Sequence, residues 1–148
     1  MLDGVLLVVD IDEHDEHGER YGPEYEPGNT SDCGTDKSAD VLWVGNSWGA
    51  SLARIDTRTH EVSYVPLPKR MQPYHVHVDS KHRAWTNLWG ADRVMRYDPQ
   101  TRTWMAFDLP TRGAEPRYVS VHEASGEPTK VVLPYFRARK IAVITLRD

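Results

Sequence analysis

Two histidines separated by one residue, His75 and His77, are the first candidates for chemistry in this sequence. They lie in the run 74–78, which has the β-branched and aromatic composition of a strand. Side chains of a strand alternate between its two faces, so both imidazoles point the same way, as in an H-x-H metal pair. Asp79 shares that side. The alternative interpretation is a pair of packed or hydrogen-bonded histidines, because the sequence assures no third ligand.

A second group of candidate ligands is the acidic segment 10–19, in which aspartates and glutamates surround two histidines. Carboxylate oxygens suit Ca²⁺ or Mg²⁺, but the spacing is not that of an EF-hand loop. Turn-forming residues follow as far as Ser38, a composition that favours a solvated loop. The sequence therefore establishes no cofactor, and Mg²⁺ or Ca²⁺ are the ions that these residues would suit.

Charge and hydropathy narrow the classes of partner. Half of the 22 acidic residues fall between Asp10 and Asp40, and the remainder of the chain is only mildly basic. This balance is unlike that of a nucleic-acid binder, and the apolar run Val5–Val9 is too short to span a bilayer. The single Cys33 cannot form an internal disulfide. The sequence does not determine the cellular compartment. We expect the cytoplasm for the chain as it stands, and the periplasm or secretion if it is cut from a longer parent.

The elements that position these residues repeat. Segments Val41–Pro68 and Arg83–Pro110 align without a gap at an offset of 42 residues. The identities are Trp43/Trp85, Arg54/Arg96, Asp56/Asp98, Thr59/Thr101, Leu67/Leu109 and Pro68/Pro110. Each unit reads as short β-prone runs separated by turns, with Asp56 and Asp98 placed to accept backbone N–H bonds in equivalent turns.

Four antiparallel strands recurring every 40 to 45 residues predict the blades of a β-propeller. The fold class is thus all-β, with about three blades in one partial propeller domain, 1–148. Blade one is assigned to 1–72, with Leu6–Asp10 ending its first strand and an acidic insertion at 13–38. Blade two is 73–115, and blade three is a truncated 116–148.

Three blades do not close a ring, because closed propellers have about four to eight. Either the remaining blades belong to a longer protein or a second copy completes the ring. The apparent lack of a fourth strand in blade three favours the first of these.

Several phrases of the sequence resemble blade motifs of the streptogramin B (virginiamycin B) lyases. They are 73–76, 87–96 and Phe107-Asp108-Leu109-Pro110, and the resemblance covers about residues 41–146. It implies a propeller related to seven-bladed enzymes that open a cyclic depsipeptide by Mg²⁺-assisted elimination. The implied chemistry needs a base beside an acidic C–H and a group that stabilises charge at the ester.

The resemblance also places catalytic positions on this chain. Glu115 and the proline after it match the start of a family tripeptide, but its histidine is replaced by Arg117. A family loop glutamate falls at Arg137, and a family histidine is replaced by Tyr74, with His75 one position later. Because an arginine is not deprotonated at working pH, lyase chemistry is not expected. If the chain is an enzyme, it is a Mg²⁺-dependent lyase of this type or a related hydrolase, with a site completed by missing blades. Glu115 and His75 are then its catalytic candidates.

By analogy with the family, the ligand face is the rim formed by the loops between blades and between second and third strands. The candidate ligand-binding residues there are Trp48, Arg70, Trp89, Arg112, Arg117, Tyr135 and Arg137, with Lys69, Glu115 and Phe136 beside them. Aromatic and guanidinium groups suit a small anionic or aromatic ligand or a protein partner. The alternative is that the tryptophans cover blade packing and the arginines are merely solvated.

Overall fold

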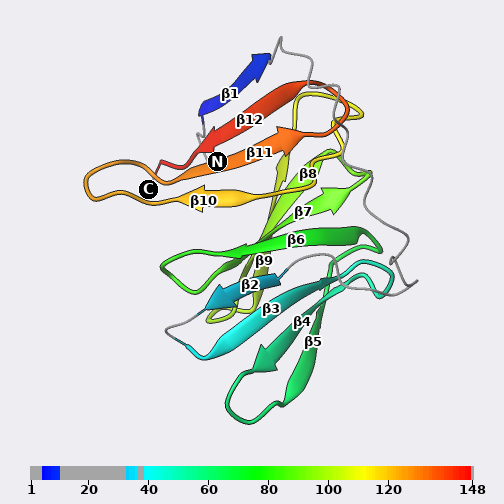
Figure 1. The fold of residues 1–148 in the computed structure, drawn as a ribbon, viewed down its shortest axis with the longest axis vertical. Coiled ribbons are helices and arrows are strands. Elements are labelled where there is room, and N and C mark those ends of the chain that lie inside the picture. Colours follow the sequence, from blue (N-terminus) through cyan, green and yellow to red (C-terminus); the bar gives the residue numbers. More distant parts are fainter. Residues whose placement is uncertain (1–4, 11–32, 37–38, 148) are drawn as a thin grey trace, which may run out of the picture.

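Three antiparallel sheets of four strands make up the fold (Figure 1). The computed structural model describes residues 5–10, 33–36 and 39–147. The sheets stand face to face, one behind another, as blades of a propeller do (Figure 1). The predicted fold class, all-β with four-stranded antiparallel blades, is confirmed. No helix long and apolar enough to cross a membrane occurs within these described ranges.

Each blade follows the chain from its first to its fourth strand, with one exception. Blade one consists of β2 (Cys33–Asp36), β3 (Val41–Asn46), β4 (Ser51–Asp56) and β5 (Val62–Pro66). Blade two consists of β6 (Gln72–Val78), β7 (Ala84–Trp89), β8 (Arg93–Asp98) and β9 (Thr103–Asp108). Blade three consists of β10 (Ser120–His122), β11 (Lys130–Tyr135) and β12 (Lys140–Thr145), and β1 (Val5–Asp10) adds its fourth strand.

The position of β1 corrects the sequence assignment, which placed Leu6–Asp10 in blade one. β1 instead pairs antiparallel with β12, from Val5 opposite Thr145 to Asp10 opposite Lys140. Blade three is therefore four-stranded rather than truncated. The first strand of blade one is β2, which lies inside the segment 13–38 predicted as an insertion. A short apolar strand pairs through its backbone and fits either sheet edge, so its sequence pattern does not select one.

The acidic residues 11–32 lie outside the described part of the chain, and with them most of the segment 10–19 proposed as a calcium or magnesium ligand.

The 42-residue repeat is visible in the backbone as well as in the sequence. Three non-glycine residues of blade one have a positive φ, and so do the residues 42 positions later. The pairs are Asp40 and His82, Ala50 and Asp92, and His60 and Arg102. Arg139 holds the same place in the loop between β11 and β12 as Ala50 and Asp92 hold in theirs. The three blades thus share one design of loop between their second and third strands.

The two predicted turn aspartates are also found in equivalent roles. Asp56 accepts the backbone N–H groups of Arg58 and Thr59, both at 2.9 Å. Asp98 accepts those of the residues two and three positions after it, at 2.8 and 3.3 Å. The bond from Thr59 and then that from Arg58 lower the pKa of Asp56. These capped turns set the register of the third and fourth strands.

The hydrophobic core lies between blades rather than within one sheet. The repeated tryptophans Trp43 and Trp85 are 2% and 0% exposed. Trp43 packs between blades one and two, edge-on to Tyr97 at 5.8 Å, and Trp85 packs between blades two and three, stacked on Phe107 at 5.4 Å. Truncating such a buried indole to alanine costs about 3–5 kcal/mol. These contacts fix the relative positions of the loops at the blade ends.

Candidate functional site

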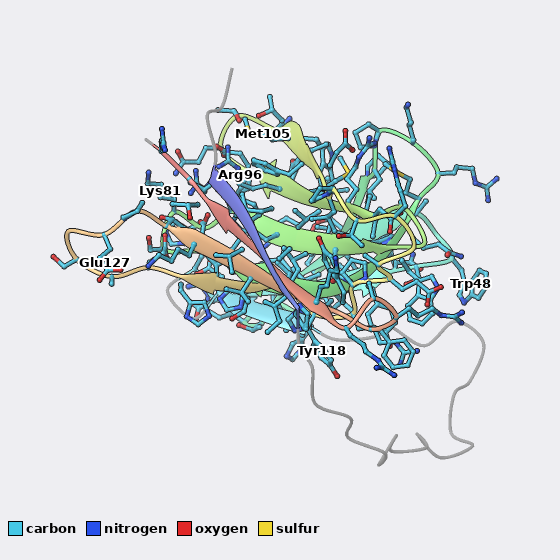
Figure 2. The ribbon with its side chains drawn as sticks, turned by 90° about the horizontal axis from the view of Figure 1, so that it is seen from above. Trp48, Lys81, Arg96, Met105, Tyr118 and Glu127 are labelled. Atoms are coloured by element: carbon cyan, nitrogen blue, oxygen red, sulfur yellow. The ribbon has the colours of Figure 1, made fainter. Side chains whose placement is uncertain are left out.

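The loops at one end of the blades form the rim. It consists of the loops 47–50, 90–92 and 136–139 within the blades and the connections 67–71 and 109–119 between them. Trp48 projects at this end, whereas Lys81 and Glu127, in the turns between first and second strands, lie at the opposite end (Figure 2). The predicted positions Trp48, Arg70, Trp89, Arg112, Glu115, Arg117 and Arg137 all lie in or beside these loops.

Arg117 contacts two aromatic rings of the rim. Its guanidinium carbon lies over both, 4.7 Å from the centroid of Trp89 and 3.6 Å from that of Phe136. Trp89 is supported from its own blade by Tyr74, with the ring centroids 5.0 Å apart. The Nε atom of Arg117 is buried and has no hydrogen-bond partner among the described residues. Cation–π contacts with two rings restrict the orientation of a guanidinium.

The connection that carries Arg117 is fixed from blades two and three. Asp92 accepts the backbone N–H groups of Gly113 and Ala114, both at 2.8 Å. Glu115 has a positive φ of 44° and accepts a bond from Arg137 Nε at 2.9 Å. The backbone of the loop 136–139 also donates to the carbonyls of residues 114 and 115. The rim between blades two and three is therefore preorganised by polar contacts.

A β-bulge in β6 shapes the inner side of the rim. The register of β6 and β7 slips between Pro73 and Val76, and the side-chain oxygen of Asn87 accepts the N–H of His75 at 3.1 Å. The amide nitrogen of the fully buried Asn87 donates to the carbonyl of Pro116. Asn87 thus joins the bulge to the connection that carries Arg117. The sequence did not predict this role. Its one signal is that the residue 42 positions earlier is a glycine, so an amide at this position departs from the repeat.

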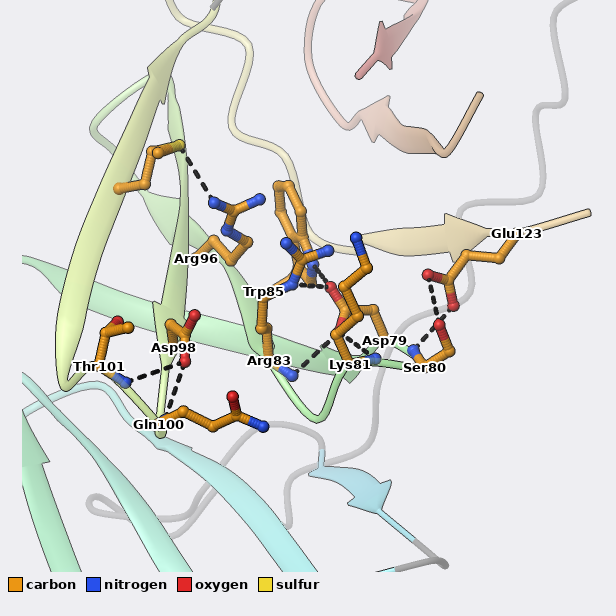
Figure 3. A network of polar contacts seen from close by, with 11 residues as sticks. Asp79, Ser80, Lys81, Arg83, Trp85, Arg96, Asp98, Gln100, Thr101 and Glu123 are labelled. Atoms are coloured by element: carbon orange, nitrogen blue, oxygen red, sulfur yellow. Dashed lines mark hydrogen bonds and ion pairs between the residues drawn. The ribbon is translucent and has the colours of Figure 1, made fainter. Parts of the chain in front are cut away.

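The histidine pair does not assemble a metal site within the described ranges. His75 Nδ1 accepts the N–H of Val119 at 3.3 Å, and its ring lies edge-on to Tyr118. Burial, followed by the nearby His122, lowers the pKa of His77. The carboxylate of Asp79 is bonded to Arg83 and to the Trp85 indole (Figure 3). No group of three histidine, cysteine, aspartate or glutamate residues that could hold an ion occurs among the residues described.

Three of the predicted ligand-binding side chains lie at the surface outside the group formed by Arg117, Trp89 and Phe136. Trp48 is 69% exposed, and Arg70 and Arg112, equivalent residues of the two connections between blades, are exposed as well. Tyr135 is a correction to the prediction, since it is only 4% exposed and packs in the core between blades two and three. It ends β11 on the face turned toward that core, and burial raises its pKa.

The residues at the lyase positions do not fit the magnesium chemistry of that family. The Glu115 carboxylate is paired with a guanidinium, and Arg117 stands where the resemblance expects a histidine. His75 uses one ring nitrogen as an acceptor inside the fold. No step through a divalent ion follows from these groups.

Comparison with known proteins shows similarity in fold. Neither a family model nor a curated protein matches the sequence. Among solved structures, a virginiamycin B lyase from Staphylococcus aureus is similar with a TM-score of 0.68 and 20% identity, covering 81% of this chain and 38% of its own. A streptogramin B lyase gives a TM-score of 0.68 and 22% identity, covering 82% and 39%. Sqt1 from Saccharomyces cerevisiae gives 0.65 and 11%, covering 87% and 34%.

The resemblance to the streptogramin B lyases is thereby confirmed as a shared propeller fold. The chain spans less than two fifths of the length of those two lyase structures. At these identities the similarity shows the arrangement of blades alone.

Proposed function

We propose that the rim binds a small anionic ligand that carries an aromatic or other planar group, without lyase activity. The observation that supports this proposal best is the guanidinium of Arg117, held against the rings of Trp89 and Phe136 with its Nε atom buried and unpaired among the described residues. A planar cation fixed in this way presents donors in a constant direction, which suits a carboxylate or phosphate.

The surrounding charges favour an anion. Arg70 and Arg112 are exposed on neighbouring connections, whereas the acidic groups nearby are already engaged, Asp108 by an ion pair with Arg93. Asp92 accepts two backbone N–H groups, and Glu115 is bonded to Arg137. Exposed arginines attract a charged ligand weakly and are screened by salt, so the half-buried Arg117 supplies most of the orientation.

Exposed aromatic surface near these cations favours a planar group on the ligand. Phe136 is 57% exposed beside Arg117, and Tyr118 is 43% exposed at the entrance to the first strand of blade three. Offset stacking on such rings adds about 0.5–1.5 kcal/mol to area burial. A protein partner with an acidic segment would use the same cations, and is distinguished by whether the small molecule alone binds.

Phenyl phosphate is a suitable probe, with inorganic phosphate and phenol as its separated halves. We expect chemical-shift changes in amide NMR spectra at the rim. Phenyl phosphate should bind at least about fivefold more tightly than phosphate, because one stacked ring contributes about 1 kcal/mol or more. Arg117→Lys keeps the charge but not the planar fork and should lose most of the binding. Arg58→Ala, on the opposite rim, is the control.

Binding that survives Arg117→Lys unchanged would contradict the proposal. Lyase activity is tested separately by incubating the protein with quinupristin and Mg²⁺ and following linear product by mass spectrometry. We expect none, and turnover that is lost in Glu115→Gln would replace the binding hypothesis with an enzymatic one.

A further inference from the structure

Trp48 is the most exposed large apolar side chain in the described part of the chain, at 69%. It projects outward from the loop 47–50 at the rim end of the blades (Figure 2). The equivalent place in the other blades is two residues before the non-glycine residue with a positive φ, and it holds Gly90 in blade two and Arg137 in blade three. Because the same loop accepts a glycine and an arginine, the blade fold does not require an indole here.

The loop that carries Trp48 is braced from within and from the next blade. The side-chain oxygen of Asn46 accepts the N–H of Gly49 at 3.1 Å, and its amide nitrogen donates to Ser51 Oγ at 3.2 Å. The hydroxyl of Ser47 donates to the carbonyl of Pro73. A braced loop loses little conformational entropy when a partner covers it, so the indole is presented ready for contact.

Two cations lie in the connection beside this loop. The N–H of Leu67 donates to the carbonyl of Ala50 at 2.9 Å, and the bond to Pro73 ties the other end of the connection to the same loop. Between these two bonds stand Lys69 and Arg70, which are exposed and have no ion pair among the described residues. Neither the loop 47–50 nor the connection 67–71 contains an acidic residue. The surface around the indole is therefore positively charged.

The shape of this surface favours a protein partner over a small molecule or a membrane. Small-molecule sites are concave and bury most of their ligand, whereas Trp48 projects from its loop. One indole beside two cations also offers much less apolar area than the amphipathic helices that bind at membrane interfaces. Protein interfaces, by contrast, concentrate their binding energy in a few tryptophan, tyrosine and arginine side chains. The two cations select a partner of negative charge.

We propose that Trp48, Lys69 and Arg70 form a docking surface for an acidic segment of a partner protein. An apolar side chain of that segment packs on the indole, and its carboxylates pair with the ammonium and the guanidinium. Exposed ion pairs contribute little to affinity, so the indole supplies most of it and the cations supply selectivity. This contact lies beyond the ligand site at Arg117 and does not rest on the binding proposed there.

The test uses a phage-displayed library of random dodecapeptides, selected on the unmodified chain with the Trp48→Ala chain as counter-selection. We expect the enriched peptides to combine an apolar residue with two or more acidic residues. By fluorescence anisotropy with a synthetic enriched peptide, Trp48→Ala should raise the dissociation constant by about thirtyfold, as at an interface hot spot. Lys69→Glu combined with Arg70→Glu should raise it by about tenfold, and added salt should weaken binding to the unmodified chain.

Two matched controls separate this surface from exposed residues in general. Tyr64→Ala removes a ring that is 63% exposed on the same blade but lies in β5, outside the loop and the connection. Arg102→Glu reverses an exposed charge in the turn between β8 and β9, at the opposite end of the blades. Both should leave the dissociation constant of the peptide within about twofold of the unmodified chain. Circular dichroism melting checks that every variant is folded.

The proposal is overturned if no acidic peptide survives the counter-selection. Loss of peptide binding in Arg117→Lys would also overturn it, because the peptide would then occupy the ligand site of the rim instead. Sedimentation of the protein with phosphatidylserine vesicles that is lost in Trp48→Ala would assign the surface to a membrane rather than to a protein.

Discussion

Asp79 should be the most consequential single acidic side chain in the described structure, and replacing it by alanine tests how the blades are held together. It is 5% exposed and accepts four hydrogen bonds. Arg83 donates from Nε at 2.7 Å and from its backbone N–H at 3.0 Å, Trp85 from its indole at 2.8 Å, and Lys81 from its backbone at 3.0 Å (Figure 3).

Removing the Asp79 carboxylate leaves the Trp85 indole N–H and the Arg83 guanidinium without their acceptor. The indole N–H of Trp85 lies in the core between blades two and three, and an unsatisfied buried donor costs about 1–3 kcal/mol. The Arg83 side chain is 12% exposed, and removing one partner of a buried ion pair costs about 3–5 kcal/mol. The two losses share one carboxylate and do not add fully, so Asp79→Ala should lower the free energy of unfolding by about 4 kcal/mol.

The repeat supplies the control. Asp36 holds the equivalent place at the end of β2, where it accepts the N–H of Ala39 and pairs with His82 at 2.7 Å. The His82 side chain is 40% exposed, so solvent compensates for most of the loss and Asp36→Ala should cost about 1–2 kcal/mol. Urea unfolding followed by circular dichroism and tryptophan fluorescence measures both. A cost below about 1 kcal/mol for Asp79→Ala, or equal costs for the two variants, would refute this reasoning.

Two further perturbations probe the described structure. Burial and then His122 hold the pKa of His77 below its ordinary 6.5, so the unfolded chain binds this proton more readily. The stability contributed by neutral His77 is therefore complete above about pH 6.5 and is lost as the pH falls toward the lower folded-state pKa. His77→Gln should flatten the fall in melting temperature between about pH 7.5 and 5.5, whereas His60→Asn, at an exposed turn, should not; equal slopes in both would argue against a buried neutral imidazole. At Gly45, an added Cβ would lie 2.5 Å from the carbonyl oxygen of Tyr74, so Gly45→Ala should cost about 1–3 kcal/mol by separating blades one and two. An unchanged melting temperature would contradict that close approach.

The repeat predicted what is local or periodic. Trp43 and Trp85 recur in the second strand because each covers the next blade, and the turn aspartates recur because the same backbone N–H groups need an acceptor. The grouping of the rim loops at one end followed from strand order, and their prediction as a ligand face came from the resemblance to the lyases. These features can be predicted without knowing which distant segments pair, because each one lies within a single 42-residue repeat unit.

The features that the sequence did not predict depend on pairing between distant segments. β1 lies more than 120 residues before β12 in the chain, and a run of five apolar residues does not specify which strand it will pair with. Tyr135 was expected at the surface because it adjoins a loop, but strand alternation turns it inward. The roles of Asn87 and of the Arg117 stack arise only when two blades are side by side, because each contact joins residues from both.

The two arginines at lyase-like positions, Arg117 and Arg137, depend on each other physically. Together they favour a different use of this rim. Arg117 cannot act as a base, but as a permanent cation it needs neighbours that tolerate it, and the rings of Trp89 and Phe136 supply two π faces. Its charge would repel a second unpaired guanidinium close by, and Arg137 is instead neutralised by Glu115 at 2.9 Å. That pairing removes the one carboxylate that matches the lyase pattern from service as a base or a metal ligand. The residues that support the proposed anion site are therefore also those that oppose elimination chemistry, so restoring a histidine at position 117 alone would leave Glu115 bound to Arg137.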